Sequence, residues 1–572
     1  MIRLSLFAAA ILAIAGSTAQ ASDPLDCMPD SARIVMVVDN PRKLAETITG
    51  LAAFKEAQIL PQVRQIYDSP TAQRLYKLLA FAEKELGAQW PNLLDQIAGN
   101  GIALGGQFQE GLGSAIAIAS GTDSVQVGKA FDLAMKMLDE EFTRQGGRDV
   151  VRIERNDGIT FAHLGADFHF ARVDKTILAA NNLDFLKEAV ALARTKPQGE
   201  RKVYKARRDA AKLLPKNPLG WIWLNMASFK ESKATKDFFD ATRQDFLQTL
   251  VVGSTIDCLR RSDFIAVGLY QESSGFRLRA RLPAGREGLW SDLALHVPPK
   301  GSIGSLALLE PPGTIYSQSF HLDIGYMWKN RERMISAENR KGFEKGEKQL
   351  SRFLPSDMKL GDLLEKWGPQ HRIVVANHDQ RPYKTVPELK LPAFGYVATM
   401  RDKKFGDNLA AIFQGISLIG MLTYGLKTVE VQHEGITING YRFDEGKTVP
   451  DDSQGDRFNF EPCFAIVGDE MMMASTIELG KKLITELKKP RQSGSAAVWK
   501  SRVSAASGAD TLAGLTDPLI TDAVLGRGVG LTEARKEIAD LIAFVRTLGT
   551  AQIEIDITAT EYRLDLVWTP GK

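Results

Sequence analysis

The chain has 572 residues, of which 44% are hydrophobic, 25% are charged and only 3 are cysteines. These values are typical of globular proteins and exclude a disordered chain, a collagen-like repeat and a small fold held by disulfides. Lysine and arginine number 72 against 69 acidic residues, a formal charge of +3, so no strong overall field favours nucleic acid or anionic lipid as a partner.

The N-terminal residues have the three-part order of a secretory signal. Arg3 precedes an apolar stretch at 4–16, and small residues follow as far as Ala21. We expect cleavage after Ala21. The apolar stretch is shorter than the ~20 residues that cross a bilayer, which argues against an uncleaved anchor. The sequence therefore predicts a signal peptide at 1–21 and an exported protein, either periplasmic or extracellular.

The order of predicted elements in residues 30–285 recurs in residues 313–572, and a proline- and glycine-rich linker at 286–312 separates them. The matching segments, in chain order, are 33–38 with 315–321, 93–97 with 363–367, 102–104 with 373–376, 115–119 with 394–398, 157–160 with 434–437, 170–173 with 464–467, 203–205 with 498–500 and 276–278 with 562–564. So many matches in one order predict an internal duplication. The alternative is that the two halves are unrelated units whose helices and strands follow in a similar order.

Predicted strands adjoin one another within each repeat. Residues 152–154, 159–164 and 168–179 are separated only by turn residues, as in an antiparallel meander. This order excludes a doubly wound parallel sheet. The helix expected at 127–142 has its apolar residues along one stripe. The expected fold class is therefore α+β, with two similar tandem repeats of antiparallel sheet and helices packed on one face.

One pair of histidines flanks a predicted turn. His163 and His169 lie on either side of Ala166, so antiparallel pairing would place their imidazoles opposite each other, with Asp167 nearby. Imidazole and carboxylate groups are common metal ligands, but two nitrogens do not complete a tetrahedral shell. The sequence favours a half-buried, hydrogen-bonded pair over a metal site. We therefore predict no metal and no cofactor, and His163, His169 and Asp167 are weak metal candidates.

The segment 409–426 carries no charged residue. Its apolar residues include Leu409, Ile412, Phe413, Ile416 and Ile419. A helix that is apolar on all sides must be covered. We favour cover by the protein's own core, and the alternatives are an interface with a partner or the other repeat, and contact with lipid. These five residues are the predicted interface or apolar-ligand positions.

Three segments of the first half carry a family resemblance. They are 38–44 (VDNPRKL), 84–91 (KELGAQWP) and 165–169 (GADFH). With these segments the chain resembles a family of exported bacterial proteins of unknown function that is abundant in planctomycete-type secretomes. The resemblance implies export and an α+β fold, and it implies no catalytic residue, cofactor or ligand.

The sequence favours a protein that is not an enzyme. Neither a Gly-x-Ser-x-Gly elbow nor a Walker sequence occurs. The expected function is an exported, non-enzymatic binding or envelope-associated protein of unknown ligand. The alternatives are a carrier of an apolar ligand in a cavity between sheet and helices, and a hydrolase with dispersed catalytic residues. The expected partner is a protein or an apolar ligand, with peripheral association with the envelope and no nucleic acid, and the sequence leaves the oligomeric state undecided.

Overall fold

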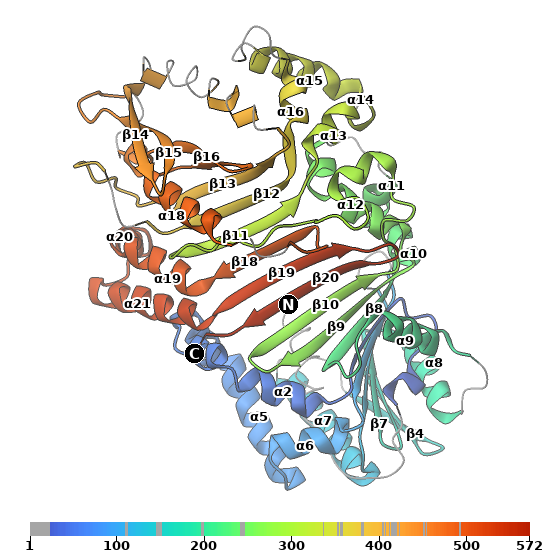
Figure 1. Ribbon diagram of the computed structural model, residues 1–572. Helices are drawn as coiled ribbons and strands as arrows, with labels where there is room; N and C mark the ends of the chain where they lie inside the picture. The colour runs from blue at the N-terminus through green and yellow to red at the C-terminus, as the bar shows by residue number, and fades with distance from the viewer. Residues whose placement is uncertain are drawn as a thin grey trace. The chain divides into compact units, whose positions relative to one another are not determined.

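The computed structural model describes residues 23–571 apart from short gaps (Figure 1). The gaps are residues 109–112, 145–150, 196–199, 241–245, 336, 352–353, 355–358, 379–381, 403–404, 407, 411, 413–419, 422–423, 450–451, 453–454 and 491–493. The predicted signal peptide, residues 1–21, lies outside the described residues. The chain divides into two compact units, Met1–Asp240 with Arg260–Pro283, and Ala241–Leu259 with Ala284–Lys572.

The first unit is built on an antiparallel sheet in which the strands run in the order β4-β5-β6-β7-β3-β2-β1-β8-β9-β10. The strands are β1 (Ile34–Val38), β2 (Ile102–Gly106), β3 (Ala115–Ser120), β4 (Arg152–Asn156), β5 (Ile159–Leu164), β6 (Phe168–Val173), β7 (Thr176–Ala180), β8 (Gly220–Asn225), β9 (Phe264–Glu272) and β10 (Gly275–Leu282). Neighbouring strands are antiparallel throughout this order.

Helices connect most of these strands in the chain. The segment η1 (Pro24–Cys27) precedes β1. The helices between β1 and β2 are α2 (Pro41–Thr49), α3 (Ala52–Ala57), α4 (Pro61–Tyr67), α5 (Pro70–Leu86) and α6 (Trp90–Ala98). The later ones are α7 (Ser124–Arg144) after β3, α8 (Leu183–Arg194) and α9 (Lys202–Leu213) after β7, and α10 (Met226–Glu231), α11 (Lys236–Asp240) and α12 (Phe246–Arg261) after β8.

The second unit has a sheet with the corresponding order, β14-β15-β16-β17-β13-β12-β11-β18-β19-β20, again antiparallel. Its strands are β11 (Thr314–His321), β12 (Trp367–Ala376), β13 (Ala393–Met400), β14 (Leu426–His433), β15 (Ile436–Phe443), β16 (Cys463–Val467), β17 (Glu470–Ala474), β18 (Trp499–Ser504), β19 (Thr550–Ile557) and β20 (Tyr562–Thr569). Its helices are η2 (Ser291–His296), α13 (Ile324–Lys329), α14 (Arg331–Met334), α15 (Ala337–Leu350), α16 (Leu360–Glu365), η4 (Asp456–Asn459), α18 (Ile477–Lys488), α19 (Ala505–Gly514), α20 (Thr516–Arg527) and α21 (Leu531–Thr547).

The antiparallel α+β class predicted from the sequence is confirmed. The two units share one strand order, as an internal repeat requires, and the common origin of the two halves stays a prediction. One matched pair of segments does not correspond, because 203–205 lies in the helix α9 whereas 498–500 enters the strand β18. Three residues are too few to separate a helical from a strand period.

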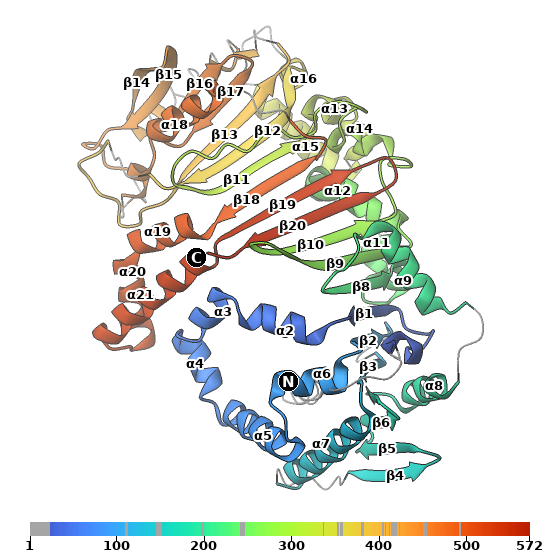
Figure 2. The same cartoon turned by 60° about the horizontal axis from the view of Figure 1, so that its bottom comes forward.

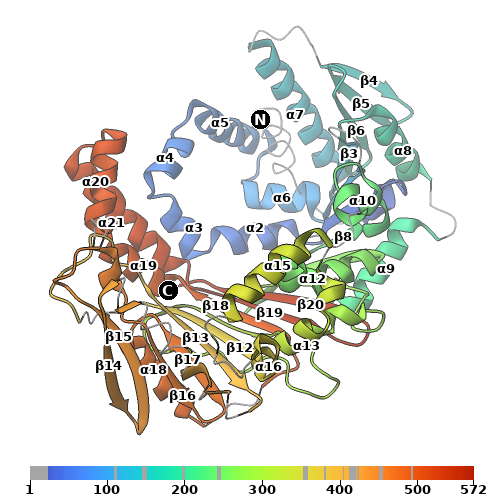
Figure 3. The same cartoon turned by 90° about the horizontal axis from the view of Figure 1, so that it is seen from above.

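Helices cover both faces of the sheet, which corrects the prediction of cover on one face only. In β7, Leu178 packs with Leu186 of α8, whereas its neighbour Ala179 packs with Phe131 of α7. Figures 2 and 3 show α7 and α8 on opposite sides of β5 and β6. Successive side chains of a strand point to opposite faces, so a strand that is apolar on both faces needs two covers.

The segment expected to link the repeats, residues 286–312, is a packed part of the second unit. It contains η2, and Leu293, Leu295 and Leu309 are buried. The prolines and glycines of this segment predicted a loop, whereas its three buried leucines pack into the core of the second unit. Residues 241–259, which include most of α12, also belong to the second unit, although the sequence placed them in the first repeat.

None of the helices in the described part of the chain combines the length and the apolar character that crossing a membrane requires.

Candidate functional site

A cavity of about 500 Å³ lies in the second unit at one end of its sheet. The register pairs Thr314 with Ala376 and Ala376 with Ala393, so the start of β11, the end of β12 and the start of β13 lie side by side. The residues that flank these strand ends, and residues of α18 and α19, line the cavity: Pro312, Gly313, Asn377, His378, Lys390, Leu391, Pro392, Lys482, Asp510, Thr511 and Gly514.

Asn377 is fixed in the wall of this cavity by three hydrogen bonds. Its backbone N–H donates to the Gly313 carbonyl at 2.9 Å. Its side-chain Nδ2 donates to the Ser507 carbonyl at 2.7 Å, and its Oδ1 accepts from Thr511 Oγ1 at 2.7 Å. Asn377 therefore ties the end of β12 to α19 and sets the orientation of the polar wall.

The charged side chains that line the cavity differ in whether they have partners. Lys482 pairs with Glu478 at 2.7 Å, and Asp510 pairs with Arg546 at 2.7 Å. His378 is buried, and its Nδ1 lies 4.0 Å from Glu478 Oε2. In the described structure Lys390 is exposed and has no ion-pair partner. The cavity therefore offers one uncommitted positive charge beside a polar wall.

This arrangement suits the binding of a small polar molecule that carries an anionic group. Small-molecule sites are usually hollows of roughly 300 to 1,000 Å³ with a few fixed polar groups that set the ligand's orientation. Thr511 Oγ1 and the Asn377 amide are fixed groups of this kind, and the exposed Lys390 adds a positive charge beside them. Most such sites are more apolar than this one, so the expected ligand is itself polar.

A second cavity, of about 280 Å³, lies in the first unit between the end of β1 and α9. Asp39 and Trp221 line it, and Arg207 stands between Asp39, at 3.8 Å, and Asp23. Burial raises the pKa of Asp39, against the opposing effect of Arg207. Arg207 is already paired with two carboxylates, but the exposed Lys216 also lines this cavity, so both cavities offer one lysine without an ion pair among the described residues. The cavity at Asn377 differs in its larger volume and in its hydrogen-bonded polar wall.

The structure brings His163 and His169 together. The two residues are directly paired across β5 and β6, and their Nδ1 atoms lie 2.9 Å apart, so one ring donates a hydrogen bond to the other. Burial lowers the pKa of His169, which favours its neutral ring. Asp167 lies in the turn between the strands. Among the described residues no group of three or more histidine, cysteine, aspartate or glutamate side chains is arranged to hold a metal ion.

Leu409 lies in the core of the second unit. It is 7% exposed and shares a cluster with Phe405 and Met471, against which Ile412 is partly buried. Neither Leu409 nor Ile412 lines the cavity at Asn377 or the cavity at Asp39. Phe413, Ile416 and Ile419 lie outside the described residues.

Sequence reasoning missed Asn377, Lys390 and Thr511. No spacing motif joins them, since they meet only through the pairing of β11, β12 and β13 and the packing of α19. The weak signal that exists is the placement of Gly313 and Pro392 next to predicted strand ends, where loops commonly carry functional residues.

By its fold the chain is an antiparallel α+β protein. Comparison with known proteins does not narrow this fold class to a family. No family model matches the chain, and no curated protein matches it. A solved structure titled "Structure of crystal form I of TP0453" is similar over 46% of this chain and 80% of that chain, with 10% identity and a TM-score of 0.23. A likeness of this size carries no argument about function.

Proposed function

We propose that this chain is an exported, non-enzymatic binding protein, and that its second unit takes a small polar molecule with an anionic group into the cavity at Asn377. The observation that carries the proposal is the polar cavity of about 500 Å³ at the ends of β11, β12 and β13. The signal-like residues 1–21 support export, and the family resemblance of the first half agrees with it.

The partners of the lining residues favour binding over catalysis. Lys482 and Asp510 are each held in an ion pair, and His378 lies beside Glu478. A carboxylate beside a histidine can also orient a general base, so the contact of His378 with Glu478 does not separate binding from catalysis. Binding has more support because Lys482 and Asp510 are committed to ion pairs and the Thr511 hydroxyl donates to Asn377 rather than to a base.

The apolar-carrier alternative also has less support. It rested on the uncharged segment 409–426, and Leu409 of that segment packs into the core with Phe405. The cavity at Asn377 is lined by lysine, aspartate, threonine and asparagine side chains, whose desolvation by an apolar ligand would cost free energy. A polar ligand keeps these groups hydrogen-bonded.

The ligand class is tested by thermal unfolding of the chain from Ser22 onward with three anionic probes, galacturonate, glutamate and phosphoglycolate, and with neutral galactose as the uncharged control. A bound probe at 100 times its Kd stabilises the folded state by about 2.7 kcal/mol. We expect at least one anion to raise the Tm and galactose to have no effect. Equal shifts with galactose and galacturonate, or no shift with any anion, would overturn the proposal.

The site is tested with a matched pair of lysine variants. Lys390→Gln removes the uncommitted charge of the cavity, whereas Lys384→Gln removes an exposed lysine of the same loop that does not line it. We expect Lys390→Gln to weaken binding of the active probe at least tenfold by calorimetry and Lys384→Gln to leave it unchanged. Equal affinities in the two variants would place binding elsewhere.

Export has a separate readout. When the full chain is produced in a bacterial host, we expect the protein recovered outside the cytoplasm to begin at Ser22, as intact mass measurement would show. A protein that keeps Met1 and stays in the cytoplasm would contradict export and would leave the binding experiment unaffected.

A further inference from the structure

The strand β4 forms one edge of the sheet of the first unit. Among the described strands it pairs only with β5, and Figures 2 and 3 show it on the outer side of β5. All of its residues are exposed. An edge strand presents a row of unpaired backbone N–H and C=O groups, and such a row can pair with a strand of another chain. A further strand can therefore add to the sheet beside β4.

The hairpin turn fixes which backbone groups of β4 face the open edge. The turn between β4 and β5 consists of residues 157 and 158, both with positive φ. In such a hairpin the residues that flank the turn, here Asn156 and Ile159, form a hydrogen-bonded pair, and hydrogen-bonded pairs alternate along the ladder. Every second residue of β4, counted back from Asn156, therefore bonds to β5. The N–H and C=O groups of the residues between them, Ile153 and Arg155, point to the open edge.

The side chains of β4 place opposite charges around an exposed apolar residue. Arg152 and Glu154 lie on one face of the strand and Ile153 lies on the other, because successive residues of a strand point to opposite faces. Ile153 is 45% exposed, although isoleucine is usually buried. Lysine and proline often keep an edge strand from pairing, and β4 contains neither.

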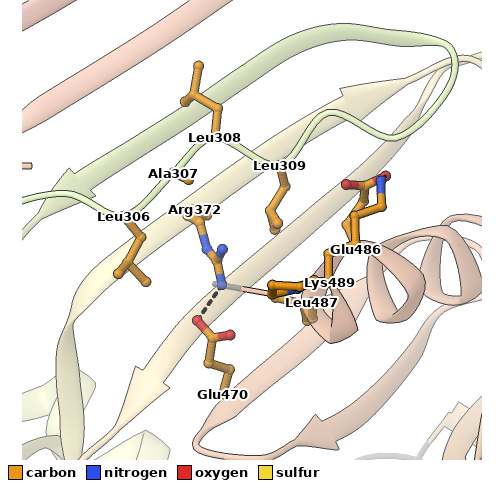
Figure 4. Close-up of a pocket in the computed structure, with 10 residues that line it drawn as sticks. Leu306, Ala307, Leu308, Leu309, Arg372, Glu470, Glu486, Leu487 and Lys489 are labelled. Carbon is orange, nitrogen blue, oxygen red and sulfur yellow. Dashed lines mark hydrogen bonds and ion pairs between the residues drawn. The ribbon is translucent and has the colours of Figure 1, made fainter. Parts of the chain in front are cut away.

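The charges of β4 differ from a charge pair inside the second sheet. Figure 4 shows Arg372 of β12 and Glu470 of β17, which point toward each other and form a buried ion pair. Arg152 and Glu154 are both exposed, and neither has an ion-pair partner in the part of the chain that the structure describes. The edge strand therefore offers one positive and one negative charge to a partner.

We infer that two copies of this chain pair through β4, antiparallel and about a two-fold axis at Ile153. In this register Arg152 of each copy lies opposite Glu154 of the other, so the symmetry forms two cross-strand ion pairs. The two Ile153 side chains lie next to each other and cover one another. The two Ile153 residues also exchange both backbone hydrogen bonds, because their N–H and C=O groups face the edge. A two-fold interface uses the same patch on both copies and closes after two.

Neighbouring registers of the same strand are unfavourable. A pairing centred on Glu154 puts two glutamates opposite each other, and a pairing centred on Arg152 does the same with two arginines. Like charges directly opposite each other destabilise a sheet. The edge strand of the second unit, β14, has no self-complementary register, because Lys427 and Glu430 lie on opposite faces. Charge complementarity to a second copy is therefore a property of β4.

The size of the contact sets the strength of the dimer. One short strand from each copy makes a small interface, so we expect a reversible dimer that forms as the protein concentration rises. The surface shares no residue with the cavity at Asn377, so the inference does not depend on the proposed function.

The test is a charge swap, followed by sedimentation equilibrium of the chain from Ser22 onward over a range of concentrations. We expect the unmodified chain to dimerise and Glu154→Arg to weaken the dimer by roughly tenfold or more, because arginines then oppose each other twice. Arg152→Glu/Glu154→Arg exchanges the charges and should restore the dimer. Glu430→Arg, a charge reversal at the exposed edge strand β14, is the matched control and should leave the dimer as it is.

Hydrogen exchange measured by mass spectrometry locates the contact. We expect peptides that contain Ile153 to exchange more slowly at high than at low concentration of the unmodified chain, and equally at both in Glu154→Arg. If the charge variants do not fold, Ile153→Lys, which puts two lysines at the axis, is measured for the same loss of dimer. A chain that is monomeric at every concentration, a dimer that Glu154→Arg leaves unchanged, or a double variant that stays monomeric would overturn the inference.

Discussion

Thr511 in α19 donates a hydrogen bond of 2.7 Å from its hydroxyl to Oδ1 of Asn377 at the end of β12. Asn377→Ala breaks this bond and the bond to the Ser507 carbonyl, and it leaves only the longer bond of 3.2 Å from Thr511 Oγ1 to that carbonyl. We expect the free energy of unfolding of the second unit to fall by about 1 to 3 kcal/mol. Urea denaturation, followed by hydrogen exchange of peptides from β11–β13, measures this change.

A double-mutant cycle separates the Asn377–Thr511 bond from other effects of each change. Contacting residues usually couple by about 0.5 to 3 kcal/mol. We therefore expect Asn377→Ala and Thr511→Val together to cost less than the sum of the single variants. Strictly additive effects would show that the bond contributes nothing to the stability of the cavity wall.

Acid should destabilise the second unit. Burial lowers the pKa of both His321 and His371 to about 4. His371 donates from Nε2 to the Leu322 carbonyl at 2.8 Å and accepts at Nδ1 from the Tyr396 hydroxyl at 2.7 Å, an arrangement that needs the neutral ring. Asp323 favours the charged ring at both histidines. Burial opposes this effect and is the larger influence on the pKa of each.

The direction of the pH effect follows from proton counts. Unfolded histidines titrate near 6.5, so between pH 6.5 and 4 the unfolded chain binds protons that the folded chain does not. Stability is therefore full above pH 6.5 and is lost as the pH falls toward 4, by roughly 3 kcal/mol for each histidine. Urea denaturation at pH 7.5 and pH 5 measures the loss. We expect His371→Gln to flatten this profile and His433→Gln, a change at a partly exposed histidine of β14, to leave it as it is.

The hairpins are the part of the fold that the sequence predicted most accurately. The matched turns at 157–160 and 434–437 join β4 to β5 and β14 to β15. Asp157 and Glu434 both have a φ of 49°, and the glycines that follow have φ values of 78° and 74°. A two-residue turn of this kind needs positive φ at both positions, which restricts its sequence strongly. Local chemistry alone therefore identifies these turns.

The candidate site could not be predicted in the same way. Asn377 and Thr511 are brought together by strand pairing and helix packing across more than a hundred residues, and neither belongs to a spacing motif. The sequence also failed to predict that helices pack on both faces of the sheet, for a related reason. A short apolar strand such as β7 shows no alternation that would reveal whether one face or two are buried. Tertiary contacts decide both features.

The turn glycines give a test with opposite expected signs. Gly158 has a φ of 78° with no atom within 4 Å of an added Cβ, so Gly158→Ala tests backbone strain alone. We expect a loss of about 1 kcal/mol. Gly342 is an exposed residue of α15, and an added Cβ there also meets nothing. Gly342→Ala should raise stability by about 0.5 to 1 kcal/mol, because alanine favours a helix. Equal signs for the two variants would contradict the turn assignment.

The role of the segment 409–426 is tested with two leucines of very different exposure. Leu409 is 7% exposed and packs with Phe405 and Met471, whereas Leu525 near the end of α20 is 80% exposed. We expect Leu409→Ala to lower the free energy of unfolding by about 2 to 5 kcal/mol, because it leaves a cavity in a packed core. Leu525→Ala should change it by less than about 0.5 kcal/mol. If Leu409→Ala instead leaves unfolding unchanged and weakens self-association in sedimentation measurements, the segment forms an interface between copies of the chain.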